Sequence, residues 1–131
     1  MNYLTTTLLN DKEIKTIKKD LNILNKNWED GKKTAGTHAA AVKNNLQLSR
    51  KSDISQKYTT FIIEKMLSNP LIKSFSLAKR IHGIMFTKSS EGMKYGRHID
   101  NAFMSTGRSD LSFTIFPVSY THLTLPTTSA V

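Results

Sequence analysis

The first part of the chain carries a clear helical pattern. Between residues 9 and 24, apolar side chains recur every three or four positions, which is the spacing of one face of an α-helix. Asn10 and Glu13 have the spacing of a capping box, and Leu9 and Ile14 have that of a hydrophobic staple. We therefore predict an amphipathic helix of about 15 residues that begins next to Asn10. Its apolar stripe consists of Ile14, Ile17, Leu21 and Leu24.

A second helical pattern begins at Ser52 or Asp53 and stops at Asn69, because Pro70 ends the periodicity. Its apolar side consists of Ile54, Tyr58, Phe61, Ile62 and Met66. Each helix thus has one apolar face.

The remaining sequence predicts turns and strands. The polar, glycine-punctuated stretch after the first helix is typical of turns and short strands, with Trp28 as a buried anchor. Residues 110–116 alternate between apolar and polar side chains, as a half-buried strand does. The candidate strands are residues 42–48, 75–86, the start of 97–104, and 110–116. Two helices followed by strands, with no regular βαβ alternation, favour an α+β or jelly-roll-like fold over a Rossmann fold.

The amino-acid composition excludes some kinds of site and leaves one alternative function open. The chain has no cysteine, which excludes disulfides and thiolate metal sites, and no apolar run near the roughly 18 residues of a membrane span. Its first residues lack a basic signal-peptide region, so we expect a cytoplasmic protein without a membrane partner. A net charge of +9 suggests a nucleic-acid partner, but the lysines are dispersed and lack interleaved aromatics. A small basic module that binds nucleic acid or an acidic partner therefore remains the alternative.

The end of the chain differs in composition from the rest. Residues 117–131 contain no Asp, Glu, Lys or Arg, so every charged side chain lies within residues 1–116. The stretch also resembles a translated sequencing-adapter sequence. We therefore predict that residues 1–116 belong to the native domain and that residues 117–131 form a non-native tail.

Candidate chemistry lies at His98 and Asp100. On a strand, residues two positions apart point to the same face, so an imidazole nitrogen and a carboxylate oxygen can meet one ion. Such ligands suit non-haem Fe(II), which a third ligand would complete as a facial triad. By itself the tripeptide is common, and two polar residues on an exposed strand are then the favoured interpretation.

The sequence around this pair carries a family resemblance. The segments "EGMKYGRHIDNAFM" and "GRSDLSFTIF" contain Tyr-Gly-x-His-x-Asp followed by Arg-Ser-Asp-Leu-Ser, at residues 95–100 and 108–112. Upstream, "WEDGKKTAG" and "VKNNLQL" form two further blocks in the same order. Together these blocks resemble the PKHD-type hydroxylases, which are prolyl-4-hydroxylase-like dioxygenases dependent on Fe(II) and 2-oxoglutarate. The resemblance covers most of residues 1–116.

The resemblance implies both a fold and a reaction. It implies N-terminal helices packed on a double-stranded β-helix (jelly roll), here incomplete and truncated after its first strands. It implies an oxidoreductase that hydroxylates a protein or small-molecule substrate with O₂ and 2-oxoglutarate, with ascorbate as a further ligand. His98 and Asp100 would be iron ligands. A second ligand histidine and an arginine for the 2-oxoglutarate carboxylate would follow farther along the chain, so the chain as given is expected to be inactive.

Other positions are assigned with less direct support. Tyr95 is a candidate for the 2-oxoglutarate contact, or packs beside the site, and Lys43, Asn44 and Asn45 line the substrate cleft or form a hydrogen-bonded turn. The family has Arg-Tyr where this chain has Lys88 and Ser89, which removes one expected aromatic contact. His122 lies in the predicted tail and too early in the topology to be the missing ligand. The resemblance therefore indicates half of a site.

Overall fold

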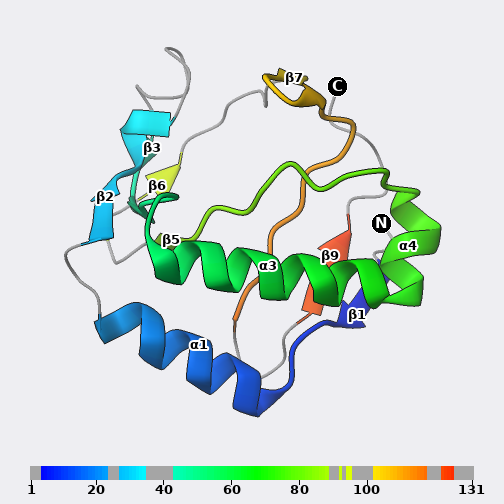
Figure 1. Cartoon of the computed structure of the whole chain (residues 1–131), viewed down its shortest axis with the longest axis horizontal. Coiled ribbons are helices and arrows are strands. Elements are labelled where there is room, and N and C mark those ends of the chain that lie inside the picture. Colours follow the sequence, from blue (N-terminus) through cyan, green and yellow to red (C-terminus); the bar gives the residue numbers. More distant parts are fainter. Residues whose placement is uncertain are drawn as a thin grey trace.

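The computed structural model describes residues 4–23, 27–34, 43–88, 92, 94–95, 102–117 and 122–125. These residues form three α-helices and several small antiparallel sheets, which confirms the α+β class (Figure 1). The helices are α1 (Asp11–Ile23), α3 (Asp53–Ser68) and α4 (Pro70–Ser76), and η2 (Gly31–Thr34) is a 3₁₀ helix. No helix in the described part of the chain is long and apolar enough to cross a membrane.

Helix α1 begins as its sequence predicts. The Asn10 backbone N–H donates to Glu13 Oε1 at 3.1 Å, and the Glu13 N–H donates to Asn10 Oδ1 at 2.8 Å, which is a reciprocal capping box. Leu9 and Ile14, the predicted staple pair, are both buried in the core. Ile17 is buried and Leu21 half-buried, whereas Leu24 lies outside the described residues.

Helices α3 and α4 are separated by a single residue that caps both. Ser52 begins α3 by accepting a hydrogen bond from the Ser55 N–H. Asn69 ends α3, and its side-chain oxygen accepts the N–H groups of Leu71 and Ile72 at the start of α4. Pro70 occupies the first turn of α4, where its missing N–H costs no helical hydrogen bond. The predicted boundary at Asn69-Pro70 is therefore confirmed, but the chain continues as a second helix.

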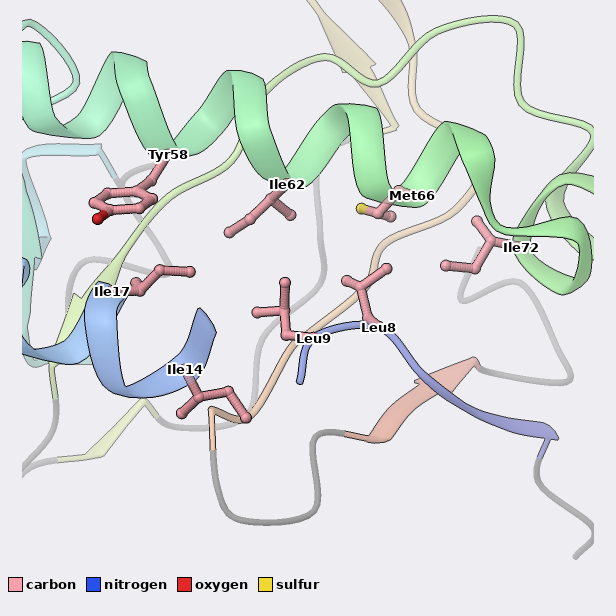
Figure 2. Packing of buried hydrophobic residues seen from close by; sticks show 8 residues of the cluster. All are labelled: Leu8, Leu9, Ile14, Ile17, Tyr58, Ile62, Met66 and Ile72. Carbon is pink, nitrogen blue, oxygen red and sulfur yellow. The ribbon is translucent and has the colours of Figure 1, made fainter. Parts of the chain in front are cut away.

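The core forms where α3 faces α1 and the segment before it. In Figure 2, Tyr58, Ile62 and Met66 project from α3 toward the side chains of α1 and its preceding segment. The cluster consists of Leu8, Leu9, Ile14, Ile17, Tyr58, Ile62, Met66 and Ile72. The Tyr58 hydroxyl also donates to Asp20, which links α3 to α1. Burial, together with this hydrogen bond, raises the pKa of Tyr58 to about 12.

The strands in the described part of the chain form four small antiparallel sheets. The first contains β2 (Trp28–Asp30), β4 (Leu46–Leu48) and β5 (Thr87–Lys88), with β4 in the centre, and the second pairs β3 (Lys43–Asn44) with β6 (Lys94–Tyr95). The third is the hairpin of β7 (Phe103–Met104) and β8 (Gly107–Arg108). The fourth pairs β1 (Leu4–Thr7) with β9 (His122–Leu125), which lies within the predicted tail.

Two predicted strands are absent as strands. Residues 75–76 complete α4, residues 77–86 follow an irregular path, and residues 110–116 are irregular apart from an isolated bridge at Ile115. Their apolar side chains nevertheless pack against the helical core, half-buried: Ile81, Ile84, Phe86, Phe113 and Ile115. The alternation correctly indicated partial burial. It did not indicate a strand, because neither segment has a partner strand in the described part of the chain.

Substituting Glu13 by glutamine should make the stability less dependent on pH. Burial raises the pKa of Glu13, but hydrogen bonds from Lys65 and the Asn10 N–H and the charge of Lys65 outweigh it, so the pKa lies below its ordinary value. A carboxyl whose pKa is lower in the folded than in the unfolded state stabilises the fold at pH values above its unfolded-state pKa. This stabilisation is lost as the pH falls through the folded-state pKa. We expect Glu13→Gln to cost about 0.5 kcal/mol at pH 7, since Lys65 is partly exposed.

Urea unfolding of Glu13→Gln and the wild-type chain at pH 7 and pH 3 measures this difference. The two curves should converge at pH 3, where the carboxyl is protonated. Lys65→Met is the matched control, because it removes the ion pair and leaves the capping box intact. An equal difference at both pH values would contradict the assignment.

Candidate functional site

The structure describes only some of the residues that the sequence singles out. His98 and Asp100, the candidate iron ligands, lie outside the described residues. Tyr95 is described through its backbone, in β6, and Lys43, Asn44 and Asn45 are described in β3 and the residue that follows it. Within the described ranges, no three His, Asp or Glu side chains gather closely enough to hold a metal ion.

Pairing of β3 with β6 brings two sequence blocks together. The strands are antiparallel, with Lys43 opposite Tyr95 and Asn44 opposite Lys94. Tyr95 opens the Tyr-Gly-x-His-x-Asp motif, and Lys43 opens the candidate cleft residues. The two sets of predicted site residues thus meet on neighbouring strands, although they are far apart in the sequence.

A third block joins them through Gly31. The Gly31 N–H donates to the Asn45 carbonyl at 2.9 Å. This hydrogen bond lies next to the Asp30–Leu46 pair, at the end of the β2–β4 ladder. A Cβ at Gly31 would lie 1.9 Å from Asn45 Oδ1 and 2.9 Å from Lys43 Cε. Only glycine permits this approach, so the Trp-Glu-Asp-Gly block and the Lys-Asn-Asn block pack as one unit. The sequence reasoning did not single out Gly31, although a glycine next to a strand often signals close backbone approach.

The candidate cleft residues differ in their burial. Lys43 and Asn45 are 5% and 8% exposed, whereas Asn44 between them is exposed. This alternation follows from the extended backbone, which turns neighbouring side chains to opposite sides. Asn45 Oδ1 is buried and has no hydrogen-bond donor among the described residues. The side of β3 that carries Lys43 and Asn45 is therefore polar but enclosed.

Burial alters the acidity of Lys43. Removal from water lowers the pKa of its ammonium group, and the charge of Arg50 acts in the same direction, while Asp30 opposes both. A lysine with a lowered pKa gives up its proton more readily than an exposed lysine.

The structure also places two other histidines, His82 and His122. His82 contacts the β7–β8 hairpin through Thr106 Oγ1 and, at 3.2 Å, the Arg108 carbonyl, which is a structural role. His122 lies in β9 opposite Thr7. Figure 1 shows β9 beside β1 and well away from β3 and β6. The structure therefore does not bring His122 to the candidate site.

Curated relatives match the chain over most of its length. A protein of Prochlorococcus marinus strain MIT 9215, named PKHD-type hydroxylase, is 70% identical over 88% of this chain and 52% of its own length. Proteins of the same name from strains MIT 9312 and NATL1A are 65% and 51% identical over the same shares. The chain thus spans about half the length of the curated relatives it matches, and no family model matches it. The resemblance to PKHD-type hydroxylases is confirmed.

Proposed function

We propose that this chain is the N-terminal half of a dioxygenase that uses Fe(II) and 2-oxoglutarate to hydroxylate a protein or small-molecule substrate. The observation that carries the proposal is the 70% identity to a PKHD-type hydroxylase over 88% of the chain, which spans 52% of that relative. In this proposal residues 1–116 form the first part of a jelly-roll domain and residues 117–131 a non-native tail. The match of 116 residues has the length of the proposed native part.

His98 and Asp100 are the proposed iron ligands. Their donor atoms fit Fe(II), because imidazole nitrogen and carboxylate oxygen suit non-haem iron and the chain has no thiolate. When bound, the iron would supply oxidation of a substrate C–H bond by O₂, coupled to decarboxylation of 2-oxoglutarate, with ascorbate as a reductant. The second histidine and the 2-oxoglutarate arginine belong to the half that this chain lacks relative to its relatives. The chain alone is therefore expected to be inactive.

Residues of the β3–β6 pair would surround the co-substrate and substrate. Tyr95 stands three positions before His98 in the sequence, and Lys43 is its partner across the ladder. We assign Tyr95 to the 2-oxoglutarate contact, and Lys43, Asn44 and Asn45 to the substrate cleft. The burial of Lys43 and Asn45 supports this assignment. Asn45 Oδ1 has no hydrogen-bond partner among the described residues, and a buried polar atom of this kind suits a polar ligand.

Anaerobic titration with Fe(II) and 2-oxoglutarate tests the proposal. The probe is a joined-half protein: residues 1–116 of this chain fused to the unmatched half of the MIT 9215 relative. We expect a metal-to-ligand charge-transfer absorption from this protein and none from the 131-residue chain. His98→Gln and Asp100→Asn should each lower iron affinity at least roughly tenfold, because each removes a ligand.

Matched controls are His82→Gln and Asp53→Asn, which make the same chemical changes at described positions with other surroundings. Both should keep the absorption. If His98→Gln also kept it, the ligand assignment would be wrong. If the 131-residue chain gave the absorption unaided, the proposed absence of half the site would be wrong.

A further inference from the structure

The described core has a large opening on one side. A cavity of about 1000 Å³ lies against the apolar faces of α1, α3 and α4, and segments 77–87 and 104–117, which are irregular except for residues of β5, β7 and β8, border it. Protein interiors are packed to nearly crystalline density, with few voids larger than a water molecule. Ile62 and Met66, which Figure 2 shows pointing from α3 into the core, also line this cavity. The helical core is therefore only partly covered.

The border of the cavity exposes large apolar side chains. Leu77 is 83% exposed, Met104 44% and Leu111 39%, and all three line the cavity. Leu77 also ends α4 with φ +48°, a left-handed conformation that is rare for leucine. Large apolar side chains that are exposed around one cavity are typical of an interaction site.

The two bordering segments are suited to receive strands. Thr87 belongs to β5 and the start of the second segment belongs to the β7–β8 hairpin, but residues 77–86 and 109–117 form no described ladder apart from an isolated bridge at Ile115. Their apolar side chains already pack half-buried on the core. Within 111–115 the apolar residues alternate with polar ones, which is the pattern of a strand with one buried face. An added strand could cover the apolar side chains and pair with the extended backbone at the same time.

The relatives contain a part that this chain does not match. The chain matches 52% of the MIT 9215 protein, so nearly half of that protein has no counterpart here. A small apolar molecule would leave backbone groups of the bordering segments without partners.

We infer that the cavity is the docking surface for the unmatched half of the relatives, and that this chain binds that half even when the two are separate polypeptides. The inference rests on the proposed function only in treating the chain as half of a longer domain. The surface consists of the cavity-lining residues of α1, α3 and α4 and of segments 77–87 and 104–117. Its occupant would contribute apolar side chains on a strand-forming backbone.

The test uses the joined-half protein with a protease site between the halves. After cleavage, the halves should elute together from a size-exclusion column at a ratio of one to one. Leu77→Asp and Leu111→Asp should weaken this association at least roughly tenfold, because burying one leucine accounts for that much affinity. Both side chains are exposed in the chain alone, so neither substitution should unfold it.

The matched control is Phe103→Asp. Phe103 is 77% exposed, comparable with Leu77, but does not line the cavity, so this substitution should change the association less than about twofold. The inference is overturned if the cleaved halves separate, or if Phe103→Asp weakens the association as much as Leu77→Asp. It is also overturned if the 131-residue chain forms a dimer that Leu77→Asp abolishes.

The outcome also separates this inference from the proposed function. Halves that stay together without binding iron support the docking surface and contradict the iron site. A joined-half protein that binds iron but falls apart on cleavage supports the iron site and contradicts docking between separate halves.

Discussion

Leu48→Ala should be among the most destabilising substitutions in the described core, at a cost of about 3 kcal/mol in the free energy of unfolding. Leu48 is 1% exposed and lies on β4, the central strand of its sheet, where its N–H donates to the Phe86 carbonyl at 2.8 Å. It does not line the large cavity, so all of its contacts are made within the chain. Truncation would leave a void that a strand paired on both sides cannot collapse to fill.

Urea unfolding followed by tryptophan fluorescence measures this cost. Trp28, the single tryptophan, lies opposite Leu48 across the β2–β4 ladder, so its emission reports on this sheet. Leu46→Ala is the matched control, because Leu46 is on the same strand and is only half-buried. We expect it to cost about 1 kcal/mol. Equal costs for the two substitutions would contradict the burial described for β4.

Gly31→Ala should destabilise the candidate site region by about 2 kcal/mol. The new methyl group would lie 1.9 Å from Asn45 Oδ1 and 3.0 Å from the Asn45 carbonyl oxygen. The backbone cannot easily retreat, because the Gly31 N–H is hydrogen-bonded to that carbonyl, and the Asn45 side chain is enclosed. Either the side chain or the β2–η2 turn must shift, and the contact between the two sequence blocks is lost.

A double-mutant cycle with Asn45→Ala isolates the steric part of this effect. Removing the amide gives the methyl group space, so Gly31→Ala should cost about 1 kcal/mol less in the Asn45→Ala background. The control is Gly83→Ala, where a Cβ would meet nothing within 4 Å and only backbone strain at φ +145° acts. The coupling with Asn45→Ala should then be absent. Strict additivity at Gly31 would contradict the close approach.

Much of the helical structure follows from local sequence. The capping box at Asn10 and Glu13 and the boundary at Asn69 involve residues three positions apart or fewer, so the sequence states them directly. Predicted core residues such as Ile17, Ile62 and Met66 are buried for the same reason, because helical periodicity sets which side faces inward. In contrast, the alternation of residues 110–116 indicated a strand, and no described strand lies beside it to form one.

In the candidate site, too, some features follow from local sequence and others only from the tertiary structure. The sequence alone determined the motif around His98 and Asp100, the chemistry that such ligands offer, and the helices with their caps, because these depend on residue type and short spacing. Only the tertiary structure decided that Lys43 lies opposite Tyr95, that Gly31 meets Asn45, and that the described residues leave a large cavity beside the helical core. Strand pairing and packing join residues far apart in the chain, and their partners are chosen by the fold as a whole.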